Sequence, residues 1–246
     1  MAIWVPSGRA LCVIGIGLLV FSARATLGAQ EEPLKRLTPA EARELIKKAL
    51  KPSPEVDANP ETPFTLQEWK DETVWDRLHA QVFKIIQDNW PRATVLICGK
   101  QVVPLGISFG GLGVESLCVT DLDGDKQPEL LFTYAWGSGV HRAELGIVRF
   151  ASQPLKWEPL GLCFLHRDLA VERVTDQSAK VLRAEIRWGA NLDKAADGAM
   201  IERGAALATI EYDQAKKQII VKAVDGLDAI TKKNLRIGVL KAESAK

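Results

Sequence analysis

Apolar residues follow three different patterns along this chain of 246 residues, and each pattern predicts a different structure. The first is an uninterrupted run from Ala10 to Phe21, the second a helical spacing between residues 38 and 91, and the third a strand-like alternation over residues 93–223. Side chains on one helix face recur about every 3.6 residues, and those on one strand face every second residue. The patterns therefore predict a short apolar leader, then helices, then strands.

The apolar leader has the three parts of a secretory signal peptide: the positive residue Arg9, an apolar stretch and a small-residue cleavage motif. Two such motifs follow, Ala23-Arg24-Ala25 and Leu27-Gly28-Ala29, and the second is favoured because the chain turns polar directly after it. Uncharged residues extend only from Ala10 to Ala23, whereas a membrane-spanning helix takes about 20. We expect residues 1–29 to be a signal peptide, the mature protein to be secreted or periplasmic, and its chain to lack a transmembrane segment.

Two capping boxes, in which a Thr is followed three residues later by Glu, mark the starts of two predicted helices. The first is Thr38–Glu41, which has proline at the first helical position, and the second is Thr65–Glu68. After the second box the apolar stripe consists of Trp75, Leu78, Val82 and Ile85. Prolines interrupt residues 51–63, so residues 30–91 are predicted to be a helical segment with a Pro-rich linker.

Alternation between apolar and polar residues predicts that residues 92–246 form a β-rich domain. It is clearest over residues 180–188, and the segments 206–212 and 218–222 indicate a hairpin. Helices and strands do not alternate there, which disfavours a parallel sheet. The predicted fold class is α+β, with N-terminal helices packed on a mainly antiparallel β-sheet or sandwich.

Composition and charge narrow the class of partner. Hydrophobic residues make up 47% of the chain and charged residues 26%, as in ordinary globular proteins. Loss of Arg9 and Arg24 with the leader takes the formal charge from +1 to −1. A chain so close to neutrality is not expected to bind nucleic acid or an anionic membrane.

Cys98, Cys118 and Cys163 lie in apolar surroundings, which favours cysteines buried in the core. In an oxidising compartment two of the three could form one disulfide, and the sequence does not decide between these alternatives.

The segment from Asp121 to Glu129 contains the clearest chemical motif of the chain. Acidic residues occupy its positions 1, 3, 5 and 9, and the carbonyl of Gln127 stands at position 7. Ca²⁺ prefers six to eight oxygen ligands, and this spacing lets a tight loop present several to one centre. An Asp- and Gly-rich hairpin turn that binds no metal is the alternative. The spacing favours calcium, because three alternating acids followed by Glu129 exceed what a turn requires.

An EF-hand would need a Glu at position 12 of this loop, where Phe132 stands instead. Residues 109–146 resemble one copy of the FG-GAP/VCBS type of calcium-loop repeat, known from integrin α-chain propellers and bacterial secreted proteins. The resemblance implies that the ligands are the side chains of Asp121, Asp123, Asp125 and Glu129, and the backbone of Gln127. Lys126 departs from the family, which usually has glycine at position 6. A second copy is absent from the sequence, so a full propeller, which takes at least four blades, is not expected.

Two further segments suggest other functions. Gly106–Gly110 matches the GxSxG motif of serine hydrolases, with Ser108 as the nucleophile and His141 or His166 as the base, but the helix that should follow is missing. The predicted strand that follows the acidic loop ends in a turn with aromatic and basic residues. These residues could form a recognition surface: Tyr134, Trp136, His141 and Arg142. A hairpin turn with a packed Trp is the alternative for that segment.

The sequence thus predicts an exported, non-enzymatic, calcium-stabilised binding or structural module. Its ligand would be a protein, a peptide or a glycan, and no feature of the sequence selects one of these three classes. The alternative is a small secreted serine hydrolase that uses Ser108.

Overall fold

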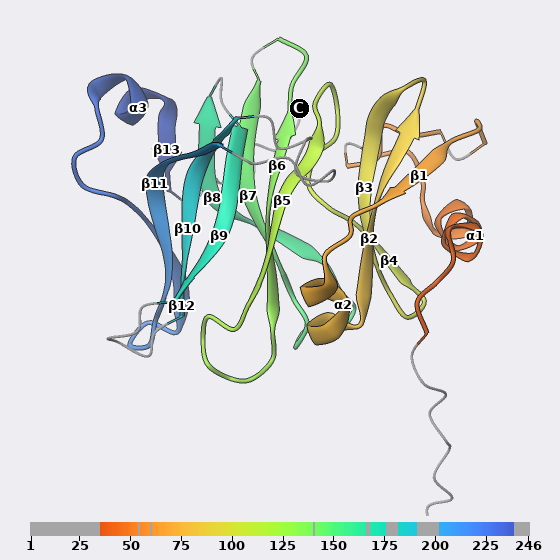
Figure 1. Ribbon diagram of the computed structural model, residues 1–246, viewed down its shortest axis with the longest axis horizontal. Coiled ribbons are helices and arrows are strands. Elements are labelled where there is room, and N and C mark those ends of the chain that lie inside the picture. The colour runs from red at the N-terminus through yellow and green to blue at the C-terminus, as the bar shows by residue number, and fades with distance from the viewer. Residues whose placement is uncertain are drawn as a thin grey trace, which may run out of the picture. The chain divides into compact units, whose positions relative to one another are not determined.

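Antiparallel sheets dominate the part of the chain that the computed structural model describes: residues 35–53, 55–59, 61–139, 141–165, 168–175, 182–190 and 202–238. In these ranges, thirteen strands form three sheets, and every neighbouring pair of strands is antiparallel (Figure 1). Three short helices accompany them, namely α1 (Pro39–Ala49), α2 (Glu72–Leu78) and α3 (Ala229–Asn234). The predicted signal peptide, residues 1–29, lies outside the described residues.

Each sheet is formed by consecutive strands of the chain, except that the last strand, β13 (Leu235–Ile237), returns to the central sheet. The first sheet has the order β1 (Thr65–Glu68), β2 (Ala80–Gln87), β3 (Trp90–Cys98) and β4 (Gln101–Pro104). The central sheet has the order β13 (Leu235–Ile237), β8 (Trp157–Leu165), β7 (Arg142–Arg149), β6 (Glu129–Trp136) and β5 (Gly113–Thr120). The third has the order β12 (Gln218–Ala223), β11 (Glu202–Asp213), β10 (Leu182–Ala190) and β9 (Asp168–Thr175).

The first predicted helix is confirmed in its local details. Thr38 caps α1, and its side chain accepts a hydrogen bond from the backbone of Glu41 while the Glu41 carboxylate accepts one from the backbone of Thr38. Ala42 and Ile46, one turn apart, are buried in a cluster with Phe83 and residues of β3.

The second predicted helix is wrong, because its sequence divides into three elements. Its expected cap, Thr65–Glu68, is strand β1, which pairs with β2. The helix that does form, α2, starts after Asp71, whose side chain accepts from the backbone of Thr73, and ends at His79 in the left-handed conformation. Val82 and Ile85, which continued the apolar stripe, lie on β2.

Burial on both faces explains why β2 resembles a helix in sequence. Seven of its eight residues are buried, including the polar Gln81, Lys84 and Gln87. These polar groups have partners: the Gln81 amide donates to the Leu37 carbonyl and accepts from its N–H, and the Lys84 ammonium lies 5.6 Å from the Trp69 ring centre. A strand with partnered polar groups needs no polar face.

The predicted α+β class, with a layer of N-terminal helices packed on a sheet, is therefore wrong. The fold is mainly antiparallel β in the described residues, and the region expected to be helical contributes strands of its own. The expected boundary after residue 91 falls inside β3, which pairs with β2 along its length. The Pro-rich segment 51–63 contributes the buried residues Val56 and Ala58 to the same cluster as α1.

The central sheet packs against an apolar cluster on each of its two faces. The acidic loop connects two strands of this sheet, so both of its ends are held in place. One cluster joins residues of β6, β7 and β8, such as Leu131 and Ile147, to the third sheet. The other joins residues such as Leu130 and Phe132 to the first sheet. Strands covered on both faces are mostly apolar, and the strand Glu129–Trp136, with seven of its eight residues buried, follows this rule apart from Glu129 and Thr133.

Farther along the chain, the alternation correctly indicates strands. The predicted hairpin is confirmed as β11 paired with β12, and the segment 182–190 is β10, while Lys180 and Val181 lie outside the described residues. No described helix combines the length and apolar character that crossing a membrane requires.

Candidate functional site

The acidic loop connects two neighbouring strands of the central sheet. It leaves β5 after Thr120 and enters β6 at Glu129, and these two residues are paired in the antiparallel register. Leu122, inside the loop, is buried in the cluster between the central and third sheets. The loop is therefore anchored at both ends and once in its middle.

Three of the predicted ligands gather at one point. A carboxylate oxygen from each of Asp121, Asp123 and Asp125 lies within 4.8 Å of the other two. The first two side chains are half-buried and the third is exposed. This convergence can supply three oxygens to one hard cation.

Backbone amides hold these side chains in place. The two Asp121 oxygens accept from the N–H groups of Gly124 and Lys126, at 2.9 and 3.1 Å. Asp123 accepts from Asp125 N at 3.1 Å, and Asp125 accepts from Gln127 N at 2.6 Å. Such Asx turns fix the loop without using all lone pairs of each carboxylate.

Lys126 occupies the position where the resembling family has glycine. Its φ is +70°, in the left-handed region that glycine adopts without cost and other residues adopt only with strain. The loop thus keeps the glycine-like turn although the side chain is lysine. No ion pair joins Lys126, or any other Lys or Arg within the described chain, to the carboxylates of the loop.

Glu129 lies beside the Asp triad and is not part of its 4.8 Å cluster. Its side chain is buried, and one oxygen accepts from Leu122 N at 2.9 Å. Burial is the largest cause that raises the pKa of Glu129, the hydrogen bond from Leu122 lowers it, and the three Asp charges add to the rise, so that the pKa is about 7. Gln127 is exposed and donates its N–H to Asp125.

The predicted recognition turn is divided between the core and the surface. Tyr134 is 1% exposed, and its hydroxyl donates to Glu144 at 2.6 Å, so its side chain belongs to the core. Burial raises the pKa of Tyr134 far above its usual range. Trp136 is half-buried, and the Arg142 guanidinium lies 5.2 Å from its ring centre. His141 lines an open pocket on the surface.

Ser108, the nucleophile of the alternative serine hydrolase, is 1% exposed in the connection between β4 and β5. Its hydroxyl has no hydrogen-bond partner among the described residues, and strand β5 follows where a nucleophile elbow would have a helix. His166 lies outside the described residues.

Cys98, Cys118 and Cys163 are free thiols. Burial raises the pKa of each, and that of Cys118 reaches about 11. Reactive cysteines need a lowered pKa and access to solvent, so these thiols have the properties of packed core residues.

The open pocket that His141 lines also includes Asp57, Trp90 and Arg92, and the sequence did not predict it. One signal was available: Asp88-Asn89 is a dipeptide suited to a two-residue hairpin turn, and both residues have positive φ. A hairpin at that point places Trp90 and Arg92 on the following strand instead of after a helix.

Known proteins offer no guide to either the acidic loop or this pocket. Compared with models of protein families, with curated proteins and with solved structures, the chain has no match in any of the three.

Proposed function

We propose that this chain is an exported, non-enzymatic binding or structural module whose β5–β6 loop binds Ca²⁺. The proposed ligands of the ion are the side chains of Asp121, Asp123, Asp125 and Glu129, and the backbone carbonyl of Gln127. The likeness of residues 109–146 to an FG-GAP/VCBS calcium loop supports the choice of metal.

The observation that carries the proposal is the gathering of three Asp carboxylates without a cationic partner in the described chain. Two like charges about 4 Å apart repel by about 1 kcal/mol even in water, and more beside a buried group such as Glu129. A divalent cation converts this repulsion into attraction. Oxygen-only ligands at the surface of an exported protein favour Ca²⁺, with a dissociation constant of about 10⁻⁴ to 10⁻³ M.

The position of the loop favours a stabilising role for the ion. Leu122 is packed in the core and Glu129 begins β6, so an ion bound by the loop would stabilise the connection between two strands of the central sheet. At a concentration tenfold above the dissociation constant, binding would add about 1.4 kcal/mol to the free energy of unfolding.

The test is thermal unfolding of the protein, expressed from the full chain, in about 5 mM CaCl₂ and in EDTA. We expect calcium to raise the melting temperature by about 3 to 6 °C. The double variant Asp123→Asn, Asp125→Asn should lose this rise. Asn retains an oxygen that accepts the loop's backbone N–H groups, so the variant removes charge and spares the turn.

Asp213→Asn is the matched control, because Asp213 caps the β11–β12 turn by accepting from Ala215 N and Lys216 N. Like the Asp residues of the loop, Asp213 accepts backbone hydrogen bonds, but it does not belong to an acidic cluster among the described residues. The melting temperature of Asp213→Asn should therefore rise with calcium as much as that of the wild type. A wild-type melting temperature that is the same in calcium and in EDTA would show that the loop is a turn without a metal.

A further inference from the structure

An open pocket of about 500 Å³ lies away from the acidic loop and combines one exposed aromatic ring with an ion pair and a histidine. It is formed by four separate segments of the chain. Its functional groups and its wall come from Asp57, Trp90, Arg92, Gly110, Gly111 and His141. None of them belongs to the loop 121–129.

Trp90 is unusually exposed for so large an apolar side chain, with 62% of its surface accessible. It is the first residue of β3, directly after the turn at Asp88 and Asn89, which have φ of +53° and +63°. This turn fixes the backbone that bears the ring. An indole face held open on a rigid hairpin is a flat apolar surface ready for stacking.

Arg92 and Asp57 provide the polar side of the pocket. Their charged groups are 3.0 Å apart and about one-third exposed, and Arg92 also lies 3.8 Å from Asp88. A backbone hydrogen bond from Asp57 N to the Arg92 carbonyl ties the two segments together. The polar groups are thus paired with each other and remain partly open to a ligand.

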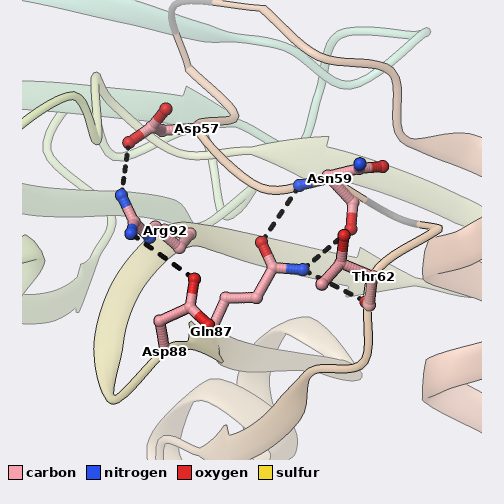
Figure 2. A network of polar contacts seen from close by, with 6 residues as sticks. All are labelled: Asp57, Asn59, Thr62, Gln87, Asp88 and Arg92. Carbon is pink, nitrogen blue, oxygen red and sulfur yellow. Dashed lines mark hydrogen bonds and ion pairs between the residues drawn. The ribbon is translucent and has the colours of Figure 1, made fainter.

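A buried glutamine keeps the Asp57 segment in position, as Figure 2 shows. The Gln87 side chain accepts from Asn59 N and donates to the carbonyls of Asn59 and Thr62, at 2.8 to 3.1 Å. It is 5% exposed. The pocket is therefore organised before any ligand binds, which reduces the entropy cost of binding.

Gly110 and Gly111 line part of the pocket without contributing a side chain, next to Leu112. A Cβ on Gly111 would lie 2.1 Å from the Ala135 carbonyl oxygen, and one on Gly110, whose φ is +65°, 2.9 Å from Ser138 N. Glycine is required at both positions by this close approach to the end of β6. These two positions therefore cannot carry a larger side chain without displacing the backbone that follows β6.

We propose that this pocket binds one ring of a neutral sugar at the surface of a glycan. The C–H face of a pyranose stacks on an aromatic ring, and its hydroxyl groups both donate and accept hydrogen bonds. Arg92 donates and Asp57 accepts, which suits hydroxyl groups on neighbouring carbons.

The charge of the lining favours a neutral ligand over an anion. Arg92 is the lining residue with a permanent positive charge, and Asp57 and Asp88 already neutralise it. An anionic ligand would compete with both carboxylates for the same guanidinium. A neutral hydroxylated ring leaves the ion pair intact.

This inference deepens the proposed binding function by naming a ligand class, and it does not depend on calcium. Titrations in calcium and in EDTA separate the two proposals. Sugar binding without a calcium effect on melting would refute only the metal site, and calcium stabilisation without sugar binding would refute only the pocket.

The experiment is calorimetric titration of the protein with cellohexaose, maltohexaose, chitohexaose and the anionic hexagalacturonate, each to about 5 mM. We expect at least one neutral hexasaccharide to bind. Its dissociation constant should change less than twofold between about 50 and 500 mM NaCl, because no net charge is neutralised.

Variants locate the binding. Trp90→Ala should weaken it at least about tenfold, whereas Trp90→Tyr, which keeps an aromatic face, should weaken it less than about fivefold. Because Trp90 is exposed, both variants should melt as the wild type does. Ile230→Ala removes a 73% exposed apolar side chain on α3 and should bind normally.

Three results would overturn the proposal. The first is that none of the neutral hexasaccharides binds. The second is that Trp90→Ala binds as tightly as the wild type, or that Ile230→Ala weakens binding equally. The third is preference for hexagalacturonate with strong dependence on salt, which would identify an anion site at Arg92.

Discussion

Glu129 brings together a buried carboxyl group and three nearby negative charges. A charged group in such a place is disfavoured by loss of solvation and by repulsion, so the pKa of Glu129 rises from 4.5 to about 7. Its neighbours in the loop are more exposed. The charge of Glu129 is therefore sensitive to pH and to a bound cation.

The first residue-scale prediction concerns pH in the absence of calcium. Between pH 4.5 and about 7 the folded protein retains the Glu129 proton that the unfolded chain releases, so the free energy of unfolding falls as the pH rises through this window. The loss should be on the order of 2 kcal/mol, measured by urea unfolding in EDTA.

Glu129→Gln serves as the comparison, since it cannot titrate and still accepts from Leu122 N. Its stability should be flatter over the same window, and at pH 7.5 it should equal or exceed that of the wild type in EDTA. Parallel pH profiles for the two proteins would show that Glu129 is not the group responsible.

A second residue-scale prediction uses two glycines. A Cβ on Gly146 would lie 2.4 Å from the Phe132 ring, within the central sheet, whereas a Cβ on Gly139 would meet nothing within 4 Å. Gly146→Ala should lower the free energy of unfolding by about 1 to 3 kcal/mol through overpacking. Gly139→Ala should change it by less than about 0.5 kcal/mol. Equal effects in urea unfolding would contradict the tight contact.

At the scale of elements, β2 shows why the helical spacing of apolar residues was misleading. Trp75 and Leu78 lie on one turn of α2, and Val82 and Ile85 lie on the strand that follows. A helix that ends and a strand buried on both faces can together produce the same spacing as one long helix. The polar residues of that strand, such as Gln81 and Gln87, have partners inside the protein.

Gln87 provides a test of that explanation. Its side chain makes three hydrogen bonds to the backbone of Asn59 and Thr62. Gln87→Ala should cost about 1 to 3 kcal/mol in urea unfolding, because partly buried backbone groups lose their partners. Gln218→Ala, on the exposed surface of β12, is the control and should be nearly neutral. A neutral Gln87→Ala would mean that the segment 57–62 is not held by this residue.

At the scale of the whole molecule, counting the reactive thiols tests both the removal of the signal peptide and the state of the cysteines. The chain is proposed to lose residues 1–29 and with them Cys12, which leaves Cys98, Cys118 and Cys163 as free thiols. After denaturation without reductant, three thiols per chain should react with a maleimide, and the mass should correspond to a chain that begins at Gln30.

The native protein should react far more slowly, because burial raises the pKa of all three thiols. One reactive thiol after denaturation would indicate a disulfide. Four would indicate that the leader is retained.

Features that depend on neighbouring residues could be predicted from the sequence. The cap of α1, the β11–β12 hairpin and the close approach of Asp121, Asp123 and Asp125 all follow from contacts within a few positions of the chain. Caps and turns are formed by local hydrogen bonds, so their residues are sufficient to predict them.

Features that depend on contacts between distant segments became known from the fold. Burial of both faces made β2 a strand, and placed Tyr134 in the core although its sequence suggested a surface turn. The pocket beside Trp90 combines segments up to 84 positions apart, from Asp57 to His141. Apolar spacing records that a side chain is buried and does not record which segment covers it, so these contacts could not be obtained from the sequence.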